Sequence, residues 1–583
     1  MKKSLLFSAV LAGLMLGSCS SSDDLAGGNN TGFNENGDGF VAVAINLPTR
    51  SGVTSRANDV FGDGDANEYE VKDAKLLLFN GADEASATFV QAYPLTLESG
   101  ESGDADKQIT THYEQTVKIS SSGLTKNIYA LVVLNDNDQN YTVGDKLSKI
   151  LTVESSSTLK NKGFLMTNAP LSTKVGAASF DGTVNTLVPI TKENIQKTPE
   201  AAKNKAVEIS VERALAKVEM GTAMTAVQNG EFTGTVKEAT GVKAGNKKIY
   251  YTVTGWELAN TNSKTYFSRT WDNSWAGYQA AGSSSYRFIG TKSLNDDTNI
   301  PASELYRTYW AIDPNYDAFT SGALKNSQVA SVNQDKIKYC LENTFNVLNQ
   351  KIKSTTCAIV GVQFFKADDD AAPNNYTPMT DFYTVDSDPS VVYDKTTIEK
   401  LILGRYVAAN SDELTACIDG TVSAQDLLKV TENSTEAGVV SYTVTAEEST
   451  KWLTGKKPTT EQLNGWKTGV DVEDLEHVKN GINYYYVPIR HFDDSETPWT
   501  ADNKTKSYPN DDGKAEQNWL GRYGVLRNNW YLLEISNIAG FGSAKVPDLE
   551  NNTDDDDNLK EYISVKINVL SWAKRTQGAI LGQ

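Results

Sequence analysis

Residues 207–220 read Val-Glu-Ile-Ser-Val-Glu-Arg-Ala-Leu-Ala-Lys-Val-Glu-Met, and this stretch decides the expected fold. Apolar and polar side chains alternate along it, which is the period of a half-buried β-strand. The alternation continues for longer than one typical strand. We therefore expect the chain to leave one sheet here and to enter another, and we place a domain boundary near Ser210.

Other segments outside this stretch show the same strand pattern. Apolar residues make up 39 % of the chain, and few long stretches have helical spacing. This composition predicts an all-β fold with two β-sandwich domains, residues 57–209 and 210–572, with loop and short-helix insertions. Polar segments at 368–375 and 499–518 are expected to be inserted loops. The clearest strand patterns lie at residues 40–47, 73–79, 127–136, 528–535 and 562–572.

The N-terminal residues have the pattern of an export signal. Two lysines are followed by an apolar run from Leu5 to Leu16 and then by Gly-Ser-Cys19. The run is too short to span a membrane and has the length of a signal-peptide core. Residues 1–19 therefore predict a lipoprotein signal with Cys19 as the lipidated residue. An ordinary secretory signal is the alternative.

Residues 20–56 are expected to combine a flexible tether with one strand. Serine, acidic, Gly and Asn residues fill the part up to about residue 39 and cannot bury a core. Residues 40–47 follow as a strand that Pro48 ends. The next segment is small and polar and carries Arg50 and Arg56, which is typical of an exposed, protease-sensitive loop. The apolar residues on one face of the strand are Val41, Val43, Ile45 and Leu47.

Composition and motifs argue against several function classes. A formal net charge of -19 excludes the basic surface that nucleic acid requires. The chain has no nucleophile elbow, phosphate loop or zinc-protease motif, so we expect no enzyme activity, cofactor or metal site. We expect His112, His477 and His491 to be surface residues. The acids in segments 63–74 and 554–557 are expected to be solvated, since the first lacks the turn glycine and the final glutamate of a calcium loop.

The cysteines and aromatic clusters leave alternatives open. Cys340, Cys357 and Cys417 have apolar or small neighbours, which favours buried thiols over one disulfide. The aromatic clusters at 271–275 and 484–486 could form a sugar platform. For the tyrosine run, a mixture of core and surface positions is the simpler interpretation.

Several of these features, taken in order, resemble the short-fimbria fimbrillins of Bacteroidales type V pili. The serines and acids after Cys19 also resemble the surface-export signal of Bacteroidota lipoproteins. The resemblance covers nearly the whole chain, and its specificity comes from order and spacing, because each motif alone is weak. The motifs are the lipobox, the first strand, the arginine loop, Tyr129–Asp136, Val211–Ala214, Gly255-Trp256, Arg527–Tyr531, the acidic linker and Val569–Trp572.

The resemblance implies transthyretin-like sandwiches and a route of assembly. The lipoprotein precursor would reach the outer membrane, and an extracellular arginine-specific protease would cut at Arg56, or at Arg50. This cut would remove Cys19 and the first strand as a propeptide. The groove would then take a C-terminal strand from an identical or related subunit. The tail, residues 573–583, is weakly apolar for a donor, and its apolar residues are Ala573, Ala579, Ile580 and Leu581.

This resemblance implies a fimbrial subunit on the cell surface that serves adhesion. A host or bacterial surface receptor is a further partner that such a role allows. Two alternatives remain at this stage. The first is an accessory or tip subunit, which would not need to donate a strand. The second is a glycan-binding surface lipoprotein that keeps its lipid and binds sugar near Trp271 and Trp275.

Overall fold

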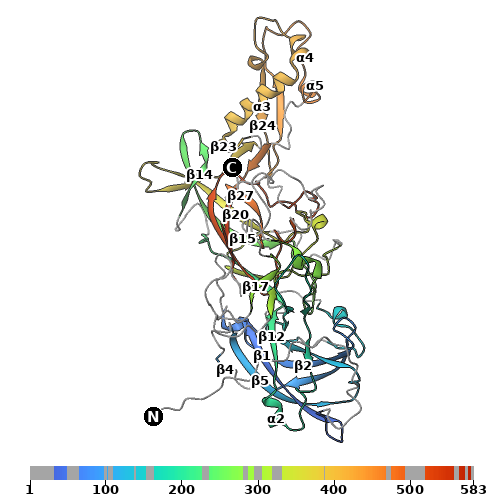
Figure 1. The fold of residues 1–583 in the computed structure, drawn as a ribbon. Helices are drawn as coiled ribbons and strands as arrows, with labels where there is room; N and C mark the ends of the chain where they lie inside the picture. The colour runs from blue at the N-terminus through green and yellow to red at the C-terminus, as the bar shows by residue number, and fades with distance from the viewer. Residues whose placement is uncertain are drawn as a thin grey trace.

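The computed structural model describes fifteen ranges of the chain. These residues form mostly β-strands with a few short helices, which confirms the predicted all-β fold. The strands of the first sandwich lie at one end of an elongated molecule, and the helices α3, α4 and α5 lie at the other (Figure 1). The ranges are 32–48, 65–97, 101–102, 109–136, 140–152, 163–225, 236–279, 286–293, 305–317, 331–385, 388–467, 475–492, 519–556, 563–570 and 575–578.

The described part of the first sandwich contains nine strands, eight of them in the order β3-β2-β6-β8-β12-β1-β5-β4 and the ninth, β11, beside β6. Its apolar core includes the inward-facing residues of β1, β2, β6 and β12. Three short helices accompany it: η1 (Ala66–Glu68), η3 (Leu147–Lys149) and α2 (Pro199–Lys203). The strands are β1 (Asp38–Pro48), β2 (Ala74–Gly81), β3 (Thr88–Leu95), β4 (Glu101–Ser102), β5 (Ile109–Ser120), β6 (Asn127–Leu134), β8 (Met166–Asn168), β11 (Val188–Ile190) and β12 (Val207–Arg213).

The alternating stretch at 207–220 forms two strands that join the sandwiches. Residues 207–210 of β12 pair with β1, whereas residues 211–213 pair with β8, so β12 passes from one layer of the first sandwich to the other. After Ala214 the chain continues as β13 (Leu215–Met220), which pairs with β19 and β28 in the second sandwich. Leu215 belongs to the first apolar core and Ala216 to the second.

The second sandwich packs a sheet of order β19-β13-β28-β29-β30 against one of order β21-β20-β15-β14-β23-β22-β26, in which β27 also pairs with β20. The short helices η4 (Asn273–Gly277) and η5 (Val347–Asn349) lie in its connections. Its strands are β13, β14 (Lys237–Ala244), β15 (Lys247–Ala259), β19 (Ile337–Leu341), β20 (Cys357–Ala367), β21 (Tyr376–Pro378), β22 (Phe382–Val385), β23 (Asp388–Tyr393), β26 (Leu475–Val478), β27 (Ile482–Pro488), β28 (Trp530–Ile538), β29 (Ile563–Leu570) and β30 (Arg575–Gly578).

Smaller sheets lie beside these sandwiches. One pairs β7 (Leu151–Thr152) of the first sandwich region with β16 (Thr265–Tyr266), which follows β15. Another has the order β10-β9-β18-β17 and likewise combines segments from both halves of the chain. These pairings tie the two halves together through the backbone. The strands are β9 (Leu171–Ser172), β10 (Val184–Asn185), β17 (Ile289–Ser293) and β18 (Tyr306–Thr308).

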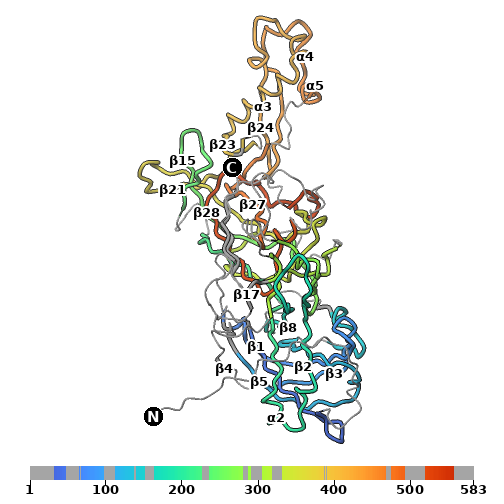
Figure 2. The backbone as a smooth tube through the Cα atoms, in the orientation of Figure 1, coloured from blue at the N-terminus to red at the C-terminus, as the bar shows by residue number. Residues whose placement is uncertain are grey.

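Residues 388–467 extend the second sandwich, and we call them the inserted module. β23 leads into the helices, and the module has an apolar core that is separate from the core of the sandwich. The tube in Figure 2 shows that it projects away from the first sandwich. Its elements after β23 are α3 (Lys395–Ala409), α4 (Ser411–Thr415), η6 (Ala424–Asp426), β24 (Leu428–Glu432), β25 (Tyr442–Ala446) and α5 (Thr460–Asn464).

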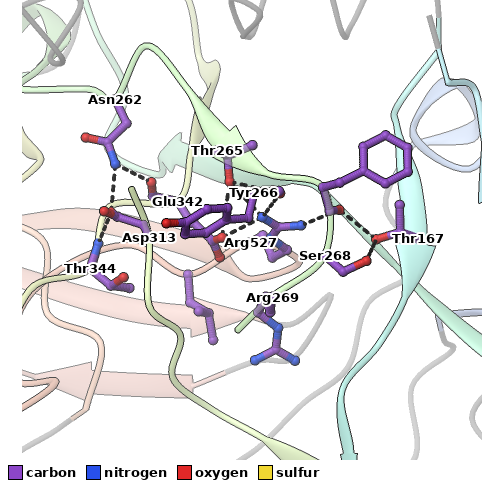
Figure 3. Close-up of polar contacts among 12 residues, drawn as sticks. Thr167, Asn262, Thr265, Tyr266, Ser268, Arg269, Asp313, Glu342, Thr344 and Arg527 are labelled. Carbon is purple, nitrogen blue, oxygen red and sulfur yellow. Dashed lines mark hydrogen bonds and ion pairs between the residues drawn. The ribbon is translucent and has the colours of Figure 1, made fainter. Parts of the chain in front are cut away.

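Buried charged side chains hold the two sandwiches together (Figure 3). Arg527 Nη2 donates to Glu342 Oε1 at 2.5 Å and to Thr265 Oγ1 at 2.7 Å, and the side chains of Arg527 and Glu342 have no solvent exposure. Arg527 Nη1 and Thr167 Oγ1 of β8 both donate to the carbonyl oxygen of Phe267. Removal of one partner of this ion pair would leave a buried charge uncompensated, which is strongly destabilising.

Two further ion pairs lie at this junction. Arg269 donates to both carboxylate oxygens of Glu212 on β12, at 2.7 and 2.8 Å. Lys217 of β13 lies 2.8 Å from Glu68 Oε1, and Glu68 is fully buried. The expectation that the acids of segment 63–74 are solvated is therefore wrong for Glu68. The sequence pattern of the loop could not show this, because the partner lies on a distant strand.

Candidate functional site

The candidate site is β1 and the groove that holds it between β5 and β12. β1 pairs antiparallel with β5 along nearly its whole length, from Asp38 opposite Ser120 to Asn46 opposite His112. On its other side it pairs parallel with β12, from Val43 opposite Val207 onward. β1 is therefore an interior strand of this layer, and its residues 43–46 are paired on both sides.

One face of β1 forms part of the core of the first sandwich. The four residues that the sequence analysis assigned to this face have at most 1 % relative exposure. Their neighbours on the adjacent strands include Val117 of β5 and Ile209 of β12, which belong to the same core. The four residues are Val41, Val43, Ile45 and Leu47.

The opposite face of β1 is also covered. Ala42 and Ala44 are buried, and α2 contacts both β1 and β5. The helix begins at Pro199, and Thr198 caps it by accepting a hydrogen bond from a backbone amide. The small alanine side chains allow this close cover. The position of α2 could not be predicted from the sequence, because a five-residue helix gives no readable period.

Polar contacts fix the register of β1. Asn46 Nδ2 donates to Glu208 Oε2 on β12 at 2.8 Å, and its Oδ1 lies 2.7 Å from His112 Nδ1 on β5. Near the other end, the backbone of Phe40 exchanges hydrogen bonds of 2.8 and 2.9 Å with the backbone of Gln196. A one-residue slip would break these contacts and would turn the apolar face outward.

Loss of β1 would open a groove in the first sandwich. It would expose apolar side chains of β5 and β12, including Ile119 and Ile209, and would leave a row of backbone groups unpaired. Complete burial of an aliphatic side chain contributes about 1.5–3 kcal/mol, so the four core residues of β1 contribute roughly 6–12 kcal/mol before ordering costs. Such a groove would bind a strand with apolar side chains on one face that runs in the same direction as β1.

The last strands of the chain lie in the second sandwich. β29 pairs antiparallel with β28, and β30 pairs antiparallel with residues 566–569 of β29. Within the described part of the chain, β30 is the terminal strand of its sheet and has one neighbour. It is therefore held by fewer backbone contacts than β1.

Several predicted site residues lie outside the described residues, and their assignments remain predictions. Among them are the lipidation site Cys19 and the cleavage sites Arg50 and Arg56. The remaining ones are the tail residues Ala573, Ala579, Ile580 and Leu581.

The other candidate residues are buried in the fold. His491 is fully buried between Tyr531 and the carbonyl oxygen of Tyr309, at 2.8 Å from each, and His477 is 5 % exposed, so the expectation of surface positions is wrong for both. Their strands carry apolar neighbours that local polarity does not reveal. Asp556 is fully buried and accepts from Thr355 Oγ1 at 3.2 Å, so the expected solvation of the acidic run is wrong at this residue.

The aromatic clusters contribute mainly to the core. Trp275 is buried, and the ring of Trp271 meets it edge-on at 5.2 Å. Tyr485 and Tyr486 are buried too, and only Tyr484 of that run is partly exposed. A flat sugar platform would need exposed ring faces, and these rings are packed against other side chains instead.

The described residues were also compared with the expectations for the cysteines, for metal sites and for membrane-spanning helices. Cys340, Cys357 and Cys417 are free thiols, of which the first two are buried. In the described ranges, no group of three or more His, Cys, Asp and Glu side chains is placed to hold a metal ion. None of the helices seen in these ranges is long and apolar enough to cross a membrane.

The buried carboxyl group of Asp313 lies at the junction and has a raised pKa. Burial raises the pKa of Asp313 to about 7. The amide of Thr344 and the side chain of Asn262 each donate to its Oδ2 at 2.7 Å, as Figure 3 shows. These contacts, together with the amide of Asn315, oppose the shift by stabilising the ionised form.

Comparison with known proteins identifies the C-terminal part of the chain. Residues 477–578 match the family model described as "Major fimbrial subunit protein type IV, Fimbrillin, C-terminal". The match includes β27, β28, β29 and β30. It confirms the resemblance to fimbrillins that the sequence motifs indicated. No curated protein matches the sequence.

Solved structures similar to the chain include fimbrial and adhesion proteins. One is a candidate cell adhesion protein from Parabacteroides distasonis ATCC 8503, with 9 % identity, 93 % of this chain and 98 % of that chain covered, and a TM-score of 0.35. Another is the tip fimbrial protein Mfa3 from Porphyromonas gingivalis with C-terminal truncation, with 11 % identity, 92 % and 100 % coverage, and a TM-score of 0.27.

Proposed function

We propose that this chain is a subunit of a type V pilus that assembles by proteolysis and strand exchange and that serves adhesion. The family match to residues 477–578 supports the fimbrial role. The single observation that carries the assembly mechanism is the position of β1, an interior strand close to the N-terminus whose removal would vacate a complete groove. We place the division between the two sandwiches at Ala214.

The first step is removal of β1. The precursor would be exported with lipid on Cys19 and held at the outer membrane. An arginine-specific protease would cut at Arg56, with Arg50 as the second choice. Until that cut, β1 fills the groove and blocks assembly. Afterwards β1 is joined to the rest of the chain only by non-covalent contacts, so another strand can compete for its place.

The second step is insertion of a strand from another subunit. To reproduce the contacts of β1, the incoming strand must run parallel to β12 and antiparallel to β5. Main-chain hydrogen bonds would supply affinity and alternate apolar side chains would supply register. The tail, residues 573–583, is the donor that we propose. Its described part, β30, has to leave one neighbouring strand, β29.

The test uses the precursor without residues 1–19 and a limiting amount of an arginine-specific protease. We expect a ladder of oligomers on a denaturing gel run without heating. Arg56→Gln should delay the ladder more than Arg50→Gln. A chain that stays monomeric after clean cleavage at either arginine would refute a stalk role and would favour a tip or accessory subunit.

Two truncations identify the donor segment. A chain that ends at Trp572 lacks the whole tail, and a chain that ends at Gly578 keeps β30 but lacks the last apolar residues. If residues 579–581 fill the groove, both truncations abolish the ladder. If β30 itself supplies the main contacts, only the first truncation abolishes it. A ladder from both chains would exclude the tail as donor.

The presence of lipid on the mature protein distinguishes a glycan-binding lipoprotein from a fimbrial subunit. A glycan-binding lipoprotein would keep Cys19 in the mature material, whereas a processed fimbrial subunit would lose it with β1. Mass spectrometry of the N-terminus of protein from the cell surface separates the two. The buried positions of Trp275, Tyr485 and Tyr486 favour the fimbrial interpretation.

A further inference from the structure

We infer that the inserted module binds the first sandwich of the neighbouring subunit in the fimbria. The inference rests on the proposed strand exchange and adds a second contact between subunits. It is carried by the directions of the strands at the two ends of the molecule. The charges of the two surfaces that these directions bring together support it.

The direction of β30 shows where the tail leaves its subunit. β13 runs away from the junction with the first sandwich, and β28 runs parallel to it. β29 runs antiparallel to β28, and β30 antiparallel to β29, so β30 runs in the same direction as β13. β30 therefore ends, at Gly578, at the end of the second sandwich that is remote from the first.

The inserted module leaves the second sandwich at this same end. β15 runs toward the junction, where it is followed by β16, which pairs with β7. β14 is antiparallel to β15 and therefore runs away from the junction, and β23 is parallel to β14. Since β23 leads directly into α3, the module extends outward (Figure 1).

Hydrogen bonds connect strands of the sheet that contains β23 to the sheet that contains β30. Asn537 near the end of β28 exchanges hydrogen bonds with Thr240 of β14, at 2.6 and 3.2 Å. Just beyond β28, the amide of Ala544 donates to Glu476 of β26 at 2.7 Å. The module and the tail thus project from one packed region.

The direction of β1 shows how the receiving subunit must lie. β12 runs toward the junction, and β1 is parallel to it. A strand that replaces β1 must enter at the end marked by Asp38 and run toward the receiver's own second sandwich. That entry end is remote from the receiver's second sandwich. The donor's tail and module therefore face the free end of the receiver's first sandwich, where α2 lies (Figure 1).

The charges on these two surfaces are complementary. Residues 411–426, from α4 to η6 of the module, contain four acidic residues and no Lys or Arg, and Lys451 of the module lies 3.8 Å from one of these acids, Asp419. Residues 191–205, which include α2, carry four exposed lysines against two glutamates. Leu453 is 45 % exposed, and its amide donates to the carbonyl oxygen of Cys417 beside the acidic stretch.

The contact would act mainly on the rate and order of assembly. Complementary charges raise the rate of productive encounter and are screened by salt. Docking of the module would hold the tail near the groove while β1 is still being displaced. The tail would then compete with β1 at a high effective concentration.

The experiment combines charge reversal with rescue in the full chain without residues 1–19. The module variant carries Asp412→Lys and Glu413→Lys, and the α2 variant carries Lys197→Glu and Lys203→Glu. We expect each to slow ladder formation after cleavage by about three- to tenfold at low salt. A single chain that carries all four changes, called the mixed variant, should form ladders at no less than half of the wild-type rate. The matched control, Asp412→Glu with Glu413→Asp, should keep that rate.

The outcomes separate this inference from the proposed function. If the wild-type chain forms ladders and both charge-reversal variants form them at the wild-type rate, the module contact is overturned and strand exchange stands. Slowing without recovery in the mixed variant would also overturn it. Absence of wild-type ladders would overturn both. Zero-length cross-linking of wild-type ladders should join residues 191–205 to residues 411–426, and ladders without this cross-link would refute the contact.

Discussion

Ile45→Ala tests whether β1 is held as the structure indicates. Ile45 has no solvent exposure and lies opposite Ile209 of β12 within the first core. Shortening a buried isoleucine to alanine costs about 2–5 kcal/mol, because transfer energy is lost and a cavity remains. The intact chain should therefore unfold with a free energy lower by that amount, as measured by denaturant unfolding of the first sandwich.

The same substitution should have a second effect after cleavage. Once the chain is cut, the lost free energy acts on the binding of the β1 fragment instead of on folding. Since about 1.4 kcal/mol corresponds to a factor of ten, the fragment should bind roughly 30-fold to several thousand-fold more weakly. Most of this change should appear as faster release. The assay is the fraction of fragment that remains with the cut chain after gel filtration at successive times.

Asp38→Asn provides the control within the same strand. Asp38 pairs with Lys118 at 2.8 Å on a partly exposed surface, where an ion pair contributes about 0–1 kcal/mol. It should change fragment release by no more than about fivefold. If the cut Ile45→Ala chain released its fragment as slowly as the control, the apolar contacts of β1 would not be what holds this strand in the groove.

Three further predictions test the fold around the site. Arg527→Ala should lower the free energy of unfolding by about 3–5 kcal/mol because it leaves Glu342 buried without its cation, and a double variant that also carries Glu342→Gln should recover part of this loss in the same denaturant titration. Gly481→Ala should lower the melting temperature far more than Gly455→Ala: both glycines have positive φ, but a Cβ at Gly481 would lie 1.6 Å from a backbone oxygen, whereas nothing lies within 4 Å at Gly455. Burial raises the pKa of Asp313 from 3.8 to about 7, so the native state holds this proton more tightly than the unfolded state does. The contribution of Asp313 to the free energy of unfolding should be present below about pH 4 and should be lost as the pH rises to 7, with a slope of at most about 1.4 kcal/mol per pH unit. Asp313→Asn should remove this pH dependence.

Strand positions could be predicted from the sequence because strand periodicity is local. Residues 41, 43, 45 and 47 alternate with smaller or polar residues, and the structure buries all four on one face. The stretch at 207–220 indicated a change of sheet, and β12 and β13 make two such changes there. In both places the property that matters lies within a few consecutive residues.

The contacts of the junction could not be predicted in this way because their partners are distant in sequence. Glu68 appeared to be a loop acid, yet it is paired with Lys217 on β13. The motif at 527–529 supported a resemblance, but nothing local showed that Arg527 would meet Glu342. The cost of burying a charge makes such pairs specific, and only the fold brings their members together.

The inserted module shows a different limit. Its apolar residues form a separate core with Ile398, Ile402 and Tyr406 on α3, a spacing of four that is readable in the sequence. From composition we expected only short helical insertions in a β domain. Length and spacing can indicate such a helix, but they do not show that it projects from the end where the tail leaves. That information comes from strand direction.

The number of neighbouring strands at each position indicates why strand exchange would favour assembly. In the described chain β30 has one neighbouring strand, whereas the groove left by β1 offers two. A tail that leaves β29 and enters a groove already vacated by β1 exchanges one ladder of backbone hydrogen bonds for two, and each bond contributes about 1 kcal/mol net. Departure of β1 breaks its own two ladders with β5 and β12. The tail also covers apolar side chains of β5 and β12 that lose their cover when β1 departs. Before cleavage the tethered β1 occupies the groove and offsets this gain, so the cut determines when assembly becomes favourable.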